Sequence, residues 1–169
     1  RRLVMDIGGG STETIIGEGF QALERESLQM GCIATTRRFF ADGKLSRKRW
    51  KEARTEITAE FQQFASAYRQ RGWHDAMGSS GTIKEICDIS VKMKLTKVSI
   101  TDASLGVIRD KLLEFETLDA IRLPGLSAER RPIIAGGLLV LESVFAALGL
   151  QRMAVSKAAL REGVADRVR

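Results

Sequence analysis

The sequence contains few of the residues that form metal centres and nucleophilic sites. Its 169 residues include two cysteines, Cys32 and Cys87, and a single histidine, His74. Cysteines this isolated indicate neither a zinc site built from cysteine pairs nor a cysteine–histidine nucleophile. We therefore expect both cysteines to be buried and to pack as small hydrophobic side chains.

Long apolar runs are also absent. No run approaches the roughly 20 apolar residues that span a membrane, and the initial RRLVMD lacks the apolar core and the cleavage site of a signal peptide. We find no internal repeat, linker or low-complexity tract. The sequence thus predicts a soluble, cytoplasmic protein with no membrane partner. Its hydrophobic content of 44% can supply the core of a single domain over residues 1–169.

The net charge of +6 is concentrated in one segment. Residues 37–54 carry eight basic and two acidic side chains, so this segment accounts for the whole excess. A positive field of this kind attracts polyanions, but the same residues can equally form a solvated helix face. A track for a long polyanion and a solvated face therefore both remain open.

The apolar pattern predicts an α/β domain. Candidate strands cover residues 3–7, 14–16, 22–29, 73–77, 98–101 and 152–155. Candidate helices cover residues 46–71, a segment from about 83 through 89, and residues 104–115, 132–148 and 158–168. In the first helix, large apolar side chains recur at three- and four-residue spacing, which predicts a buried face, and Ser46 can cap its start. Pro132 suits the first turn of the helix at 132–148.

The segment DIGGGSTE, residues 6–13, interrupts two apolar strands with three consecutive glycines. Glycine costs conformational entropy on folding, so its placement here requires either a backbone with positive φ or the close approach of another group to bare backbone. The amides of Gly8, Gly9, Gly10 and Ser11 and the hydroxyls of Ser11 and Thr12 are candidate phosphate contacts.

A second segment has the same character. Gly78, Ser79, Ser80, Gly81 and Thr82 lie where a strand is followed by a helix. Such a turn exposes backbone N–H groups at the positive end of the helix dipole, where phosphate is commonly held. In the alternative interpretation, the hydroxyl residues merely cap the helix that begins near Ile83. Two such turns in one domain favour phosphate binding.

Two carboxylates flank the first glycine turn. Asp6 lies at the end of the first strand and Glu13 follows the glycines. A tight bend therefore places both carboxylates beside the glycine turn. Anionic side chains repel phosphate unless a cation lies between them or a water must be oriented. Mg²⁺ fits both needs, because it binds one or two carboxylates together with phosphate oxygens. Glu13 as an ordinary edge-strand residue is the alternative.

Four segments together resemble the second half of the catalytic module of the exopolyphosphatase and guanosine pentaphosphate phosphohydrolase (Ppx/GppA) family. They are DIGGGSTE, GSSGTIKEI, LPGLSAERRPIIAGG and ALREGVADRV, and they span nearly the whole chain. The resemblance implies an α/β domain of the actin, Hsp70 and sugar-kinase (ribonuclease H-like) superfamily, with a five-stranded mixed β-sheet flanked by helices. It also implies that Asp6, Gly8 and Glu13 belong to the family's second phosphate loop, and that residues 78–82 form a further ligand-facing turn.

The resemblance also implies a partner domain. Family members have a preceding domain with another phosphate loop and, shortly before the segment at which this sequence begins, a glutamate taken to be the catalytic base. We expect this chain to be the second domain of that module, with the preceding domain as its partner, and to be inactive alone. We expect the parent protein to be a homodimer.

The implied chemistry is hydrolysis of a terminal phosphoanhydride bond of polyphosphate or guanosine pentaphosphate, with no specific nucleic acid as partner. Asp6 holds Mg²⁺ or its waters, Glu13 orients water or the metal, and Arg130 is a candidate contact for a distal phosphate or the guanosine end. Two other classes remain: a module that binds polyphosphate or an alarmone without turnover, and a nucleotide-binding kinase or chaperone relative. The last requires an adenosine site, for which Gly136 and Gly137 are the only hint, and we prefer close helix packing as their explanation.

Overall fold

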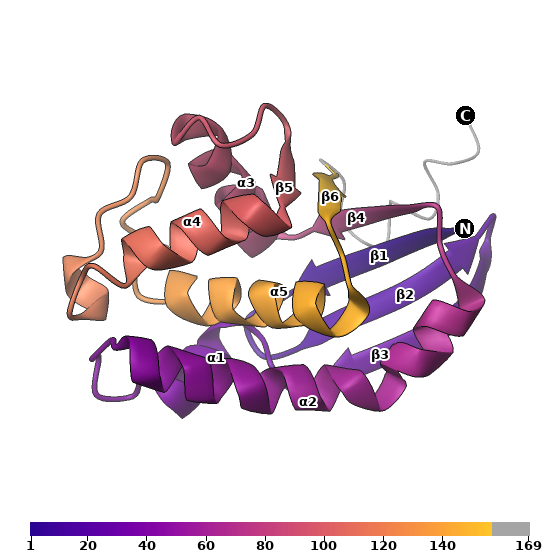
Figure 1. Cartoon of the computed structure of the whole chain (residues 1–169), viewed down its shortest axis with the longest axis horizontal. Helices are drawn as coiled ribbons and strands as arrows, with labels where there is room; N and C mark the ends of the chain where they lie inside the picture. The colour runs from indigo at the N-terminus through magenta and orange to yellow at the C-terminus, as the bar shows by residue number, and fades with distance from the viewer. Residues whose placement is uncertain (157–169) are drawn as a thin grey trace.

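The computed structural model describes residues 1–156 as a sheet of six strands in the order β3-β2-β1-β4-β6-β5 (Figure 1). The strands are β1 (Arg2–Ile7), β2 (Thr12–Glu18), β3 (Gln21–Leu28), β4 (Asp75–Ser79), β5 (Ser99–Thr101) and β6 (Arg152–Val155). The helices are α1 (Cys32–Phe39), α2 (Arg47–Arg71), α3 (Gly81–Lys92), α4 (Asp102–Leu112) and α5 (Ile134–Leu148), with a 3-10 turn at Leu118–Ala120.

Strand β1 lies at the centre of the sheet, between an antiparallel and a parallel neighbour. It pairs with β2 through a tight hairpin and with β4 in parallel. The residues of β1 alternate in burial, with Leu3, Met5 and Ile7 on the buried face and Asp6 on the other. Asp6 therefore projects away from the helices that cover the core.

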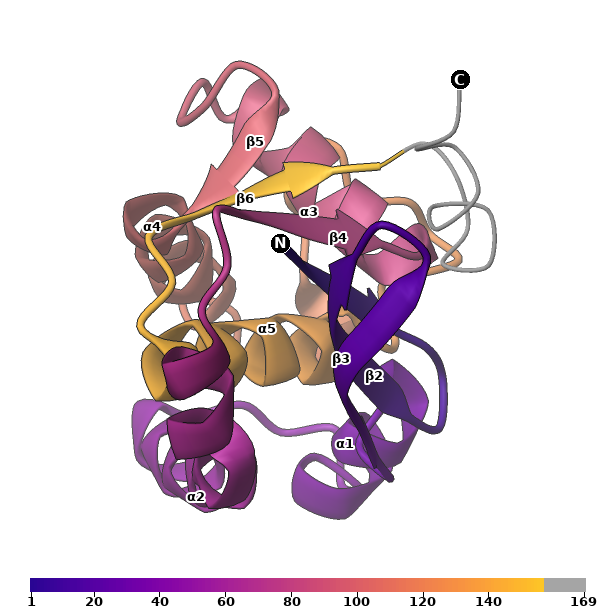
Figure 2. The ribbon, with the colours of Figure 1, turned by 90° about the vertical axis from the view of Figure 1, so that its right-hand side faces the viewer.

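Helix α2 confirms the amphipathic pattern read from the sequence. The Ser46 hydroxyl accepts a hydrogen bond from the Arg49 amide and caps the helix. All six residues of the predicted stripe are at least nine-tenths buried: Trp50, Ala53, Ile57, Phe61, Phe64 and Tyr68. Helix α5 is buried along almost its whole length and lies beside α2 (Figure 2).

Several elements differ from the sequence-based expectation. The sheet has six strands where the family resemblance implied five. Strand β4 begins two residues later than predicted, and Pro132 precedes α5 instead of lying in its first turn. Helix α1 was not predicted: it is short, contains three β-branched residues and has no side-chain cap. The helix predicted at 158–168 lies outside the described residues.

Two expectations about composition can be compared with the structure. Both cysteines are buried, as predicted, and burial raises the pKa of the Cys87 thiol. Within residues 1–156, no helix combines the length and the apolar character needed to cross a membrane.

Candidate functional site

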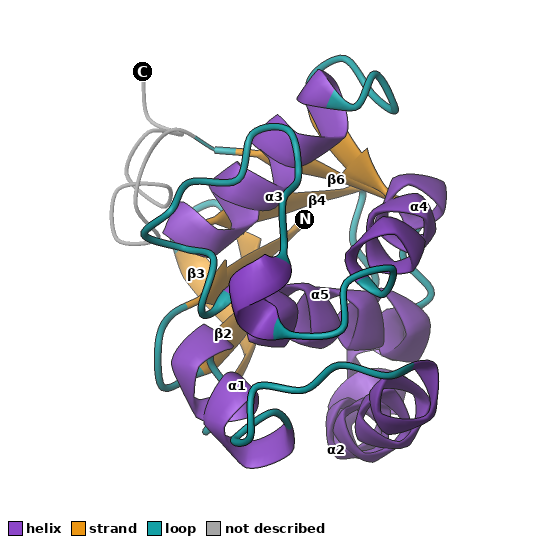
Figure 3. Cartoon of the chain, turned by 90° about the vertical axis from the view of Figure 1, so that its left-hand side faces the viewer, coloured by secondary structure: helices purple, strands orange, loops and turns teal. Residues whose placement is uncertain are grey.

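The two turns rich in glycine and hydroxyl residues lie at the same edge of the sheet. Strands β1 and β4 are parallel neighbours, and each leads at its C-terminal end into one of the turns. Helix α3 continues from the end of β4 at this edge (Figure 3). In open α/β sheets, ligands bind outside the carboxyl ends of the strands. The topology therefore brings together two segments that are about seventy residues apart in sequence.

A row of polar side chains crosses this edge. The strand register places Glu13 of β2 directly opposite Asp6 of β1, and Asp6 beside Ser79 of β4. Paired residues on neighbouring strands project from the same face of a sheet. The structure thus brings the Asp6 and Glu13 side chains together beside the glycine turn, as the sequence suggested. Like charges directly opposite each other on two strands are destabilising unless something compensates for them.

The electrostatics of Asp6 are those of a carboxylate without a partner. The Asp6 carboxylate accepts no hydrogen bond from any residue in the described part of the chain, and Asp6 is half-buried. Burial raises the pKa of Asp6, and the negative charge of Glu13 raises it further, while the cationic Lys84 opposes both effects. A cation bound between the two carboxylates would relieve this cost.

Glu13 is held in one orientation by two hydroxyl groups. Its Oε1 atom accepts hydrogen bonds from the Ser11 hydroxyl at 2.7 Å and from the Ser27 hydroxyl at 3.2 Å. Its Oε2 atom has no hydrogen-bond partner among residues 1–156. The Ser11 hydroxyl therefore positions Glu13, and only the amide of Ser11 is left to contact a phosphate.

The glycine turn presents three backbone amides. The Gly8 amide donates to the Ser11 carbonyl at 2.9 Å, so it is already satisfied and does not serve as a phosphate donor. The amides of Gly9, Gly10 and Ser11 have no acceptor in the described residues. Successive unpaired backbone N–H groups form a concave site for anions. Of the predicted phosphate contacts, the Ser11 hydroxyl and the Gly8 amide are therefore used within the protein. The amides of Gly9, Gly10 and Ser11 remain as candidate donors to a phosphate.

The contacts around these glycines show how far protein packing alone requires them. None of the three has a positive φ. A Cβ atom on Gly9 would lie 3.0 Å from the Ile33 side chain, whereas a Cβ on Gly10 would meet nothing within 4 Å. The Ile33 side chain is exposed and can move by the few tenths of an ångström that a Cβ on Gly9 needs, so protein packing strictly requires glycine at neither position 9 nor position 10. Close approach by a group outside the described residues would require it.

The structure corrects the prediction that the Thr12 hydroxyl contacts phosphate. This hydroxyl is buried and donates to the Met30 carbonyl at 2.5 Å, so it points away from the turn. Strand alternation causes this, because Thr12 lies between Ser11 and Glu13, which project from the other face. The Thr12 side chain supports the strand and does not contact a ligand at the turn.

The second turn combines helix capping with backbone strain. The Ser80 hydroxyl accepts a hydrogen bond from the Ile83 amide at 3.2 Å, which confirms the capping interpretation for this residue. However, Ser80 has φ of +136° and ψ of 161°, a conformation that is almost restricted to glycine. Capping does not require this geometry, and strain of this kind is concentrated at ligand sites. Ser79 is buried beside Asp6.

Arg130 lies directly over the second turn, although it is 49 residues further along the chain than Gly81. Its Nη1 atom donates to the Thr82 hydroxyl at 3.3 Å, and its Nε atom pairs with Glu85 at 2.9 Å. A Cβ atom on Gly81 would collide with its Nη2 atom. The guanidinium and the start of α3 thus form one positively polarised surface.

Close packing at glycines holds this edge together. A Cβ on Gly31 would overlap the backbone of Gly8 and Gly9, whose carbonyls accept hydrogen bonds from the first amides of α1. Similarly, Gly136 contacts α1, and a Cβ on Gly137 would overlap the Thr82 side chain. The preferred explanation of the glycine pair, close helix packing, is confirmed.

Sequence reasoning missed four contributors: Ser27, Gly31, Lys84 and Glu85. Ser27 and Glu85 act through contacts between segments distant in sequence, so no local pattern marks them. Gly31 follows the candidate strand at 22–29, and its close packing against the glycine turn joins segments distant in sequence. Within residues 1–156, no three His, Cys, Asp or Glu side chains are grouped as metal ligands. Asp6 and Glu13 form a pair of carboxylates that could hold a metal ion whose other ligands are water or phosphate oxygens.

Comparison with known proteins identifies relatives along nearly the whole chain. The sequence is 39% identical over 163 residues to a guanosine-5'-triphosphate,3'-diphosphate pyrophosphatase of Pseudoalteromonas translucida, covering 96% of this chain and 33% of the relative. It is 37% identical over 164 residues to a Haemophilus influenzae protein provisionally named an exopolyphosphatase, covering 97% of this chain and 51% of the relative. The chain thus spans between a third and about half of the curated relatives it matches.

Solved structures confirm the fold class. A Ppx/GppA phosphatase from Aquifex aeolicus superposes with a TM-score of 0.80 at 22% identity, covering 97% of this chain and 55% of that chain. An exopolyphosphatase from Cytophaga hutchinsonii gives a TM-score of 0.75 at 22% identity, covering 99% and 58%. The mixed sheet flanked by helices is therefore the fold of these Ppx/GppA structures, as the family resemblance implied. Because the Ppx/GppA phosphatase family matches residues 1–168, this chain belongs to that family.

Proposed function

We propose that this chain forms one side of the active site of a phosphohydrolase that removes terminal phosphate from polyphosphate or guanosine pentaphosphate. The observation that carries the proposal is the pairing of Asp6 with Glu13 beside three unpaired amides. Two like charges at a phosphate-binding turn are best explained by a cation that both the carboxylates and the phosphate share.

Mg²⁺ is the cation that best fits these residues. It binds one or two carboxylates and takes its other ligands from phosphate oxygens and water, and the described site offers two carboxylates. Asp6, half-buried and without a hydrogen bond, would hold it. When bound, Mg²⁺ neutralises negative charge that develops on the phosphate oxygens.

The protein's own groups would position the reacting phosphate. The amides of Gly9, Gly10 and Ser11 would hold its oxygens, and Glu13 Oε2 would orient the attacking water. Arg130 and the amides at the start of α3 would contact a more distal phosphate. Phosphoryl transfer depends mainly on positioning and electrostatic stabilisation, which such groups supply.

The substrate class rests on the relatives. One is named for a guanosine nucleotide and another for polyphosphate, and both ligands present a terminal phosphate to the same groups. Both relatives are longer than this chain. We therefore propose that turnover belongs to a longer protein that includes a partner domain, and that this chain alone binds the ligand without efficient hydrolysis.

Titration of the 169-residue chain with tripolyphosphate tests this function. Calorimetry should detect binding in the presence of Mg²⁺ and much weaker binding in EDTA, because the carboxylates repel the anion when no cation is present. Asp6→Asn should abolish the dependence on Mg²⁺, whereas Glu26→Gln, which changes an exposed carboxylate on the edge strand β3, should not. Orthophosphate release should remain negligible. Equal binding with and without Mg²⁺, or rapid hydrolysis by this chain, would refute the corresponding part of the proposal.

The basic segment at 37–54 is less available than its charge suggests. Arg38 pairs with Glu56 and Glu60, Arg47 with Asp110, Arg49 with Asp42 and Arg54 with Glu142. The bond from Arg49 lowers the pKa of Asp42 to about 2. Four exposed cations have no ion pair in the described residues: Arg37, Lys44, Lys48 and Lys51.

The polyanion track remains a prediction, and these four cations are the candidates that need not break an ion pair to contact an anion. Replacing Lys44, Lys48 and Lys51 by glutamine should weaken binding of long polyphosphate but leave tripolyphosphate binding nearly unchanged. The loss should shrink at high salt, because exposed charges are screened beyond about 8 Å at physiological ionic strength. A salt series with both ligands measures this. A loss independent of ligand length would remove the track from the proposal.

A further inference from the structure

Glu85 is a charged side chain that the proposed chemistry does not use. It lies on α3, only 11% of its side chain is exposed, and both of its oxygens have partners. Its Oε2 atom pairs with Arg130 Nε at 2.9 Å. Its Oε1 atom accepts a hydrogen bond from the Ser127 amide at 2.5 Å. Burying a carboxylate this deeply costs free energy unless its ion-pair and hydrogen-bond partners compensate for the lost hydration.

The loop before α5 is fixed to α3 at the same place. Gly125 has φ of +89°, and a Cβ atom there would lie 3.1 Å from the backbone of Asp88 and Ile89. The Ser127 hydroxyl in turn accepts a hydrogen bond from the Arg130 amide at 3.3 Å. Glu85 therefore holds both the backbone that leads to Arg130 and the guanidinium of Arg130 itself.

This arrangement determines which nitrogen of Arg130 is available to a ligand. Nε forms the ion pair with Glu85, and Nη1 donates a hydrogen bond to the Thr82 hydroxyl. Nη2 lies against Gly81 and has no hydrogen-bond partner in the described residues. The guanidinium is rigid and planar, so fixing Nε and Nη1 also fixes the direction of Nη2. That direction is toward the start of α3.

We propose that Glu85 is a positioning residue: it holds Arg130 over the start of α3 in the orientation that binds a distal phosphate. This inference rests on the proposed function, in which Arg130 contacts that phosphate. A group fixed before binding loses less conformational entropy when the ligand arrives. The ion pair thus improves anion binding even though Glu85 is itself negatively charged.

The sign of this effect separates positioning from simple electrostatics. Removing a negative charge near an anion site should strengthen anion binding if only the local field matters. Glu85→Gln should instead weaken it, because glutamine has one acceptor oxygen and no charge, so it cannot serve both the Arg130 guanidinium and the Ser127 amide. Glu129 is the matched control, since it is exposed, adjacent to Arg130 and without an ion pair in the described residues.

The test is titration of the 169-residue chain with tripolyphosphate and Mg²⁺, followed by calorimetry and by the NMR resonance of the Arg130 Nε–H group. We expect Glu85→Gln to raise Kd about tenfold, which corresponds to about 1.4 kcal/mol, and to move that resonance. Glu129→Gln should leave Kd unchanged or lower it. Adding Glu85→Gln to an Arg130→Ala background should have no further effect. Thermal unfolding confirms that each variant is folded.

The outcomes distinguish the two proposals. If Arg130→Ala leaves Kd unchanged, the proposed contact of Arg130 with phosphate is wrong. If Arg130→Ala weakens binding but Glu85→Gln leaves it unchanged or strengthens it, the positioning role alone is overturned, and Glu85 instead competes with the ligand for Arg130. If Glu85→Gln weakens binding equally in the wild type and in the Arg130→Ala variant, the effect of Glu85 does not depend on Arg130.

Discussion

Replacing Asp6 by asparagine in the full-length protein should slow orthophosphate release by about 10²–10³-fold, the loss typical when one group that stabilises charge in the transition state is removed. Glu13→Gln should have an effect of similar size, because it removes the carboxylate that orients water. Glu26→Gln is the control, as an exposed carboxylate on β3. Near-normal turnover of either site variant would show that its assigned role is wrong.

The stability of Asp6→Asn should change in the opposite direction to its activity. Burial and Glu13 raise the pKa of Asp6 in the folded protein above its usual 3.8. The folded state therefore binds a proton more tightly, and the free energy of unfolding falls as pH rises from about 3.8 through the raised pKa. Asp6→Asn lacks this fall, so at pH 7 it should be at least as stable as the wild type. Mg²⁺ should raise the thermal midpoint of the wild type only.

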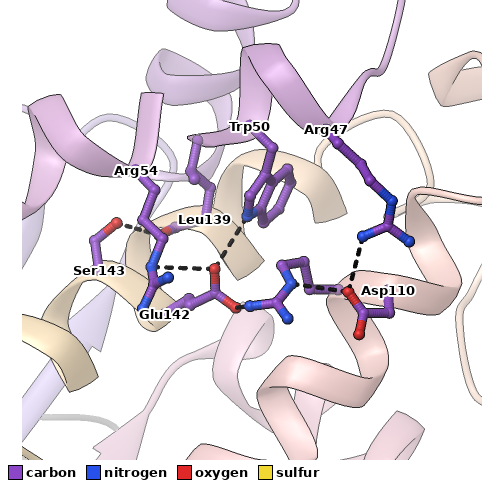
Figure 4. A network of polar contacts seen from close by, with 8 residues as sticks. Arg47, Trp50, Arg54, Asp110, Leu139, Glu142 and Ser143 are labelled. Atoms are coloured by element: carbon purple, nitrogen blue, oxygen red, sulfur yellow. Dashed lines mark hydrogen bonds and ion pairs between the residues drawn. The ribbon is translucent and has the colours of Figure 1, made fainter. Parts of the chain in front are cut away.

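A second large effect is expected far from the turns, at Glu142 on α5 (Figure 4). Its side chain is 3% exposed and joins three helices. It accepts a hydrogen bond from Trp50 Nε1 at 3.0 Å and pairs with Arg109 at 3.0 Å and with Arg54 at 3.3 Å. Trp50 is almost completely buried, whereas the two arginines are partly exposed.

Glu142→Ala should lower the free energy of unfolding by about 3 kcal/mol, near the lower end of the range for breaking a buried ion pair. The loss stays at that end because Arg54 and Arg109 can regain water, while the Trp50 N–H cannot. For a domain of this size, the thermal midpoint should fall by about 10 °C.

Asp110→Ala is the matched control for Glu142, because Asp110 also joins two arginines but is half-exposed. It should cost no more than about 1 kcal/mol, as exposed ion pairs are screened by solvent. Chemical denaturation of the three proteins measures both values. Equal losses for the two variants would show that burial of Glu142 does not determine its contribution.

The strands and the long helix could be predicted because their patterns are local. The apolar run of β1 and the stripe on α2 depend on residues close in sequence, and the structure confirms the strand and the helix. The pairing of Asp6 with Glu13 also followed from local reasoning, since a tight hairpin leaves few registers. Helix α1 could not be found this way, because its β-branched residues disfavour a helix and its stability depends on packing against α5.

The site was predictable in its composition but not in the role of each group. The glycine turn was recognised from its residues, yet the satisfied Gly8 amide and the buried Thr12 hydroxyl became clear only from hydrogen bonds formed after folding. The contact of Arg130 with α3 joins positions nearly fifty residues apart, and Glu85 holds it there. Long-range contacts of this kind have no signature in a single sequence.

The most direct measurement is residue-resolved NMR of the isotope-labelled 169-residue chain during titration with tripolyphosphate and Mg²⁺. The amide resonances of Gly9, Gly10 and Ser11 should shift in proportion to ligand occupancy, and that of Gly8, already bonded to the Ser11 carbonyl, should shift least. In EDTA these shifts should largely disappear. Binding that leaves all three amide resonances in place while others move would contradict a phosphate site at this turn.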